Sequence, residues 1–90
     1  MRIARRLMIR GRVQGVGFRH FTCEAATLEG VTGWVRNLPD GRVEAYLEGE
    51  SDAVTRVERV VRAGPRGARV DEVDAHAEPA DGSSRDFRIY

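Results

Sequence analysis

The stretch Gly11–Arg19, which reads G-R-V-Q-G-V-G-F-R, combines two residue types that together can bind an anion. Glycines such as Gly15 and Gly17 can adopt positive φ, which lets successive backbone N–H groups point into one concavity with no Cβ in the way. Arg19 adds a planar guanidinium group whose N–H donors match the geometry of a phosphate. A helix beginning within this stretch would add the positive end of its dipole. These residues predict a cradle for an oxyanion.

The hydrophobic pattern around this stretch predicts a strand before it and a helix after it. Leu7, Ile9, Gly11 and Val13 alternate with three arginines and Met8, which is the period of a half-buried strand. Apolar residues then recur at helical spacing at Phe18, Phe21, Ala25 and Leu28, and Gly30 is expected to end the helix. The cradle is therefore expected where the strand turns into the helix.

The rest of the chain predicts a hairpin, a second helix and two more strands. In order, these are a strand over 31–37, a turn at 38–41, a strand through Val43–Glu48, a helix capped by Ser51 and ended by Gly64-Pro65, a strand through Val73–Ala77 and a short strand at Phe87–Ile89. The order βαββαβ with an extra C-terminal strand favours an α+β, ferredoxin-like sandwich, with an antiparallel sheet and both helices on one face.

This topology predicts which distant residue faces the cradle. The first strand, first helix and second strand form a split βαβ unit, so the two strands run parallel and end at the same edge of the sheet. Asn37 closes the second strand and is the only asparagine of the chain. We therefore expect Asn37 beside the cradle.

Composition narrows the class of protein further. The 90 residues suit one domain, 1–90, and the net charge of +1 gives no overall reason to expect a nucleic-acid or membrane partner. All fifteen basic residues are arginines, which excludes a Walker-type phosphate loop and lysine-nucleophile chemistry. The single cysteine, Cys23, permits no internal disulfide, and His20 and His76 are not spaced as metal ligands. We expect a cytoplasmic monomer with no metal and no cofactor.

Two segments together resemble the acylphosphatase family. They are Gly11–Arg19 and the stretch Gly33–Glu44, which reads G-W-V-R-N-L-P-D-G-R-V-E, and the likeness extends over essentially the whole chain. The resemblance implies an enzyme that hydrolyses the carboxyl-phosphate anhydride of small acyl phosphates, releasing inorganic phosphate, without metal or cofactor. It also implies that Arg19 and Asn37 are catalytic, with Asn37 positioning water. The phosphate-binding residues that it implies are Gln14, Gly15, Val16, Gly17, Phe18 and Arg19.

Two alternatives stay open on the sequence. The first is a ferredoxin-like module that binds an anionic metabolite, or binds RNA through its sheet; RNA binding requires aromatic side chains on the exposed central strands, and those strands present arginines, Met8, Glu44 and Glu48. Trp34 and Tyr46 are interpreted as strand packing. The second alternative is a domain directed at carbamoyl phosphate.

Overall fold

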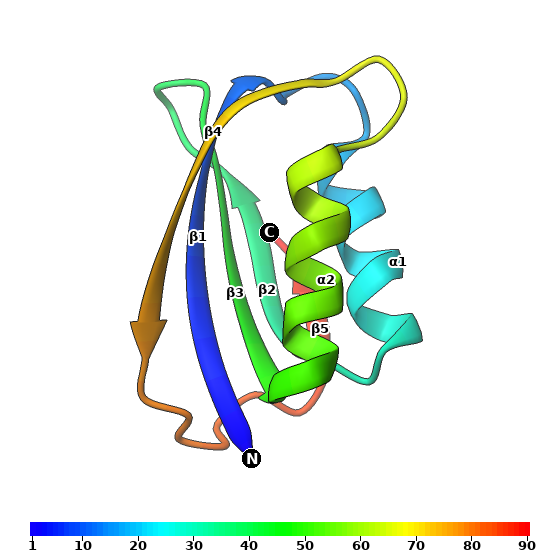
Figure 1. The fold of residues 1–90 in the computed structure, drawn as a ribbon. Helices are drawn as coiled ribbons and strands as arrows, with labels where there is room; N and C mark the ends of the chain where they lie inside the picture. The colour runs from blue at the N-terminus through cyan, green and yellow to red at the C-terminus, as the bar shows by residue number, and fades with distance from the viewer.

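The chain alternates strands and helices in the predicted order. The computed structural model describes all of residues 1–90. Its elements are β1 (Arg2–Arg12), α1 (Phe18–Leu28), β2 (Thr32–Asn37), β3 (Val43–Glu50), α2 (Ser51–Ala63), β4 (Arg69–Glu78) and β5 (Phe87–Ile89). The ferredoxin-like α+β fold is confirmed (Figure 1).

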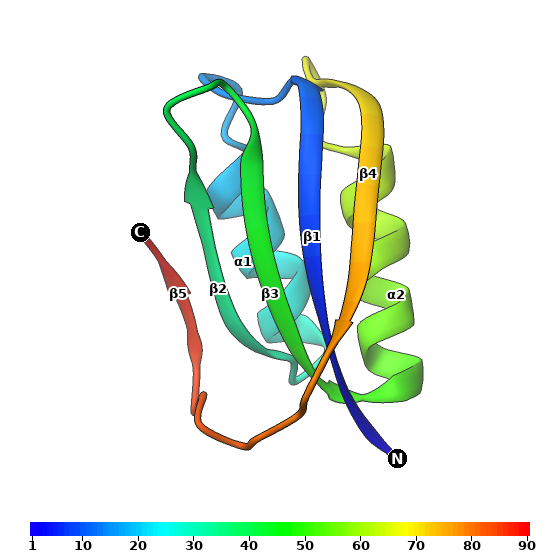
Figure 2. The same ribbon diagram turned by 90° about the vertical axis from the view of Figure 1, so that its left-hand side faces the viewer.

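The five strands form one sheet in the order β4-β1-β3-β2-β5. β3 pairs antiparallel with both β1 and β2, so β1 and β2 run parallel, as the split βαβ unit predicts. The sheet is mixed, however, and not wholly antiparallel, because β5 pairs parallel with β2. After β4 the chain crosses to the other edge of the sheet and enters β5 in the direction of β2 (Figure 2).

Both helices cover the same face of the sheet and enclose the core (Figure 1). In α2 the buried valines Val54, Val57 and Val61 are those that the sequence pattern indicates. In α1 the buried stripe is Phe18, Thr22 and Ala26, whereas Leu28 is 84% exposed. The expected stripe was wrong at Leu28, because the buried face of α1 is turned toward Thr22 and Ala26. Thr22 tolerates burial because its hydroxyl donates to the carbonyl oxygen of Phe18 at 2.9 Å.

The face of the sheet away from the helices, here called the open face, is covered by ion pairs. Glu48 is fully buried and accepts hydrogen bonds from Arg2 (3.1 Å), the Tyr46 hydroxyl (2.9 Å) and the Gly82 N–H (2.8 Å). Glu44 is also buried, between Arg6 at 3.0 Å and Arg36 at 2.7 Å. The expectation that both carboxylates lie exposed on this face was wrong, because arginines of neighbouring strands and the segment 79–86 close over them.

The open face also carries aromatic side chains. The rings of Trp34 and Tyr46, which are register partners on β2 and β3, stack at 6.1 Å with an interplanar angle of 14°. The Arg36 guanidinium lies 5.4 Å from the centre of the Trp34 ring. The interpretation of both rings as strand packing agrees with these contacts, and the open face carries the two rings in addition to the expected arginines, Met8, Glu44 and Glu48.

The helix ends follow the sequence signals only in part. Gly30 has φ +69° directly after the C-cap of α1, as predicted. At α2 the N-cap is Glu50, with no side-chain cap, so Ser51 begins the helix and does not cap it. Neither helix has the length and apolar character needed to cross a lipid bilayer.

Candidate active site

The predicted cradle is the loop that joins β1 to α1. Gly15 and Gly17 adopt φ of +75° and +76°, and Gly17 is the N-cap of α1 in the left-handed conformation. A Cβ built on either glycine meets no atom within 4 Å. The backbone conformation, and not a lack of space, therefore requires glycine at these two positions.

The loop presents a run of backbone donors that no other part of the chain uses. None of the N–H groups of residues 15–20 donates a hydrogen bond to a main-chain acceptor, and no side chain caps α1. No acidic residue lies in the first turn of the helix. The N-terminal end of α1 thus combines unpaired N–H groups with the positive end of the helix dipole, the usual features of an anion site.

Arg19, in the first turn of α1, is held against the C-terminal segment. Its Nη1 donates to the main-chain carbonyl oxygen of Tyr90 at 2.8 Å, and the N–H of Tyr90 donates to the carbonyl oxygen of Val35 at 2.9 Å. No aspartate or glutamate side chain pairs with Arg19. The contact with Tyr90 therefore fixes the guanidinium group near β2 and leaves its other N–H donors free for a ligand.

Gln14 connects the cradle to the turn that follows Asn37. Its side-chain amide donates to the carbonyl oxygens of Leu38 at 2.8 Å and of Arg42 at 3.0 Å. The loop and the turn lie at the same end of the sheet (Figures 1 and 2). Because the Gln14 side chain is directed to the turn, a part of Gln14 in phosphate binding would belong to its backbone N–H.

Asn37 is the last residue of β2 and is adjacent to Leu38. Its side chain is half-buried and makes no hydrogen bond within the protein, in contrast to that of Gln14. The structure therefore brings an uncommitted carboxamide to the same edge as the cradle and Arg19, as the strand topology predicts.

A comparison with known protein families identifies the family to which this chain belongs. The family model described as Acylphosphatase matches residues 5–89. The chain belongs to the acylphosphatase family. It is therefore an enzyme that hydrolyses acyl phosphates, and acyl phosphate is its class of substrate.

Individual relatives agree with this assignment. The chain is 56% identical to an acylphosphatase of Pyrobaculum arsenaticum over 84 residues, covering 92% of this chain and 88% of that one. It is 54% identical to an acylphosphatase of Rubrobacter xylanophilus, covering 93% of this chain and 76% of that one. The crystal structure of an acylphosphatase from Bacillus subtilis matches with a TM-score of 0.94 at 33% identity, covering 98% of both chains.

The other reactive side chains of the chain are those of His20 and Cys23. His20 is exposed on α1. The Cys23 sulfur is half-buried, 4.0 Å from the Thr27 hydroxyl and 3.9 Å from the carbonyl oxygen of Phe87. No three His, Cys, Asp or Glu side chains lie close enough together to hold a metal ion.

The contact between Arg19 and Tyr90 is the feature of this site that sequence reasoning missed. The two residues are 71 positions apart, and the acceptor is a main-chain oxygen that every residue type carries. No signal in the linear sequence could have shown it. Only the parallel pairing of β5 with β2 brings Tyr90 to this edge.

Proposed function

We propose that the chain hydrolyses the carboxyl-phosphate bond of small acyl phosphates with the cradle, Arg19 and Asn37 alone. Backbone N–H groups of the loop 14–18 and the Arg19 guanidinium bind the phosphoryl oxygens. The Asn37 carboxamide orients the attacking water. The observation that carries this proposal is the run of unpaired N–H groups in residues 15–20 beside an arginine that no aspartate or glutamate side chain neutralises.

The chemistry of the substrate makes this small set of groups sufficient. A carboxylate is a good leaving group, so breaking its bond to phosphorus requires mainly positioning and neutralisation of charge on the equatorial oxygens. The water oxygen forms the new bond to phosphorus while the carboxylate departs with the electron pair of the broken bond. Because an amide is not a strong base, the proton of the water goes to a phosphate oxygen and not to Asn37.

The assignment of Asn37 predicts a separation of binding from turnover. In Asn37→Ala, the affinity for inorganic phosphate should stay within about 2-fold of the parent, while turnover of benzoyl phosphate falls about 10²-fold or more. In Arg19→Ala both should fall, because the guanidinium group contacts phosphate in the ground state and in the transition state. Calorimetry with inorganic phosphate and an assay with benzoyl phosphate, at matched folded fractions, measure the two quantities.

Arg59→Ala is the matched control, since Arg59 is exposed on α2 and has no carboxylate partner. It should keep both binding and turnover. If phosphate affinity and turnover fell equally in Asn37→Ala, the role of Asn37 would be phosphate binding and not the positioning of water. A parent protein that binds phosphate without turnover would instead be a sensor module.

Substrate range tests the leaving-group argument. Acetyl, carbamoyl and benzoyl phosphate should all be hydrolysed in excess EDTA, whereas para-nitrophenyl phosphate should be turned over negligibly, because a phenolate leaves less readily than a carboxylate. Activity that is lost in EDTA and restored by a metal ion would overturn the metal-free mechanism.

We also propose that the protein acts as a monomer in the cytoplasm. The cradle, Arg19 and Asn37 all come from one chain, so the site needs no second copy. The free Cys23 suits a reducing compartment. Sedimentation of the purified protein, with activity independent of protein concentration, tests the monomer.

A further inference from the structure

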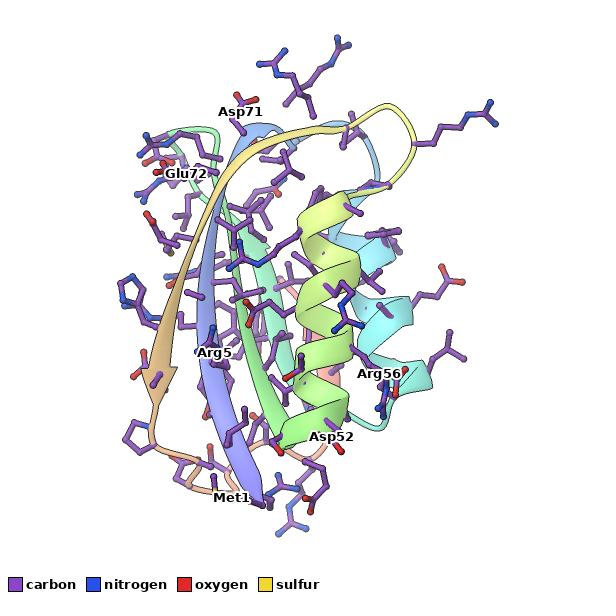
Figure 3. The ribbon with its side chains drawn as sticks, in the orientation of Figure 1. Met1, Arg5, Asp52, Arg56, Asp71 and Glu72 are labelled. Atoms are coloured by element: carbon purple, nitrogen blue, oxygen red, sulfur yellow. The ribbon has the colours of Figure 1, made fainter.

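The end of the sheet that carries the cradle has more positive than negative charge. Three carboxylates lie at this end, on the turn after β2 and at the start of β4, and Figure 3 shows Asp71 and Glu72 at the end opposite Met1. Each pairs with its own arginine: Asp40 with Arg42 at 2.8 Å, Asp71 with Arg69 at 2.8 Å, and Glu72 with Arg10 at 3.4 Å. The other arginines at this end are therefore not neutralised.

Arg12 is one of these free arginines. It is the last residue of β1, directly before the cradle loop, and it is exposed with no carboxylate within 4.0 Å. Its register partner on β4 is Arg69. Because Arg69 is already paired with Asp71, the neighbouring strand offers Arg12 no counterion.

Arg66 is the second free arginine. It is exposed in the turn between α2 and β4, and it too has no carboxylate partner. This turn begins beside the start of α1, because a Cβ built on Gly64 would be 3.4 Å from the ring of Phe18, the first residue of that helix. The segments 11–19 and 63–70 contain no aspartate or glutamate.

We propose that Arg12 and Arg66 form an electrostatic collar around the cradle, which draws phosphate dianions to Arg19 without contacting them in the bound state. The collar raises kcat/KM by concentrating the substrate at the site and leaves kcat unchanged. As a statement about acyl phosphates this rests on the proposed function, but the attraction acts on any phosphate dianion.

The test compares two double variants of equal net charge. Arg12→Gln/Arg66→Gln removes the collar, and Arg59→Gln/Arg85→Gln removes two exposed, unpaired arginines from α2 and from the segment before β5. At an ionic strength of about 0.01 M, where charges act over about 30 Å, kcat/KM for benzoyl phosphate should fall about 5- to 10-fold in the first variant and less than about 2-fold in the second. At about 0.5 M salt the difference should nearly vanish.

Three results would overturn the collar. If kcat/KM fell equally in both double variants, the effect would be one of net charge. A fall in kcat would place the arginines in the chemical step, and a loss of kcat/KM that salt does not reduce would indicate direct contact with the substrate. Thermal melts and the single variants identify a loss caused by unfolding. If the parent shows no turnover, the proposed function fails, but calorimetry with inorganic phosphate still tests the collar through the same variants and the same salt dependence.

Discussion

At the residue scale, we propose that Arg19 performs two tasks with one guanidinium group, contacting Tyr90 and binding phosphate. One Nη atom donates to the main-chain oxygen of Tyr90 at 2.8 Å, while the remaining donors make no hydrogen bond within the protein. Arg19→Lys keeps the charge but replaces the planar fork with a compact ammonium group, which cannot serve Tyr90 and two phosphate oxygens in the same geometry. We expect kcat for benzoyl phosphate to fall about 10²-fold or more.

Arg59→Lys provides the control for this change of side chain, since Arg59 is exposed on α2 and has no ion pair. It should leave kcat and KM unchanged. If Arg19→Lys retained nearly the activity of the parent, Arg19 would act as a diffuse positive charge, and the bidentate contact would be wrong.

At the element scale, the relation between the cradle loop and the β2–β3 turn depends on Gln14. Gln14→Met keeps the volume but removes both donors to the carbonyl oxygens of Leu38 and Arg42, which still accept from the N–H groups of Gly41 and Leu38. The loss of stability should therefore be small, about 1 kcal/mol, or 4–8 °C in Tm. Because the loop can then shift relative to Asn37, we expect kcat to fall about 10-fold.

Thermal melts and steady-state kinetics, together with calorimetry using inorganic phosphate, measure these effects. The affinity for phosphate should change little, because the Gln14 side chain is directed to the turn. A large loss of phosphate affinity with unchanged Tm would show that this side chain binds the ligand directly.

At the scale of the whole molecule, the buried carboxylates of the open face make the free energy of unfolding depend on pH. Burial alone would raise the pKa of Glu44 and of Glu48, but hydrogen bonds outweigh it and hold each pKa below its ordinary value. The donors are Arg36 and Arg6 to Glu44, and Arg2, Tyr46 and the Gly82 N–H to Glu48. Since the unfolded chain then binds more protons in acid, the stabilisation is complete above about pH 4.3 and is lost as the pH falls through the lower folded-state pKa values.

Urea unfolding at pH 7 and at pH 3 measures this dependence. In Glu48→Gln we expect the free energy of unfolding to fall by about 1–3 kcal/mol at pH 7 and to depend less on pH below about pH 4.3. Glu24→Gln, which changes an exposed carboxylate of α1 without an ion pair, should leave the stability at pH 7 unchanged. If the free energy of unfolding decreased equally between pH 7 and pH 3 in Glu48→Gln and in the parent, Glu48 would not contribute to the pH dependence.

Hydrophobic periodicity and local chemistry were enough to predict the order of the elements and the place of the cradle. Alternating residues before Gly15 and helical spacing after Phe18 are local signals, and the split βαβ rule then places Asn37 at the same edge. The identity of Gly17 as a residue with positive φ also follows from local sequence, because few other residue types adopt that conformation.

The tertiary structure alone decided which residues of a local pattern are buried and which distant groups meet. Leu28 lies outside the core because α1 packs on the sheet through the stripe Phe18, Thr22 and Ala26, and a hydrogen bond to the Phe18 carbonyl oxygen allows the Thr22 hydroxyl to be buried there. Glu48 is buried because donors from β1, from β3 and from the segment before β5 converge on it. The Arg19 contact with Tyr90 and the unpaired state of Arg12 depend in the same way on strand order and register. Hydrophobic periodicity indicates which positions of one element share a face. The partners of a polar group come from segments far apart in the chain, and only the packing of these segments brings them within hydrogen-bond distance.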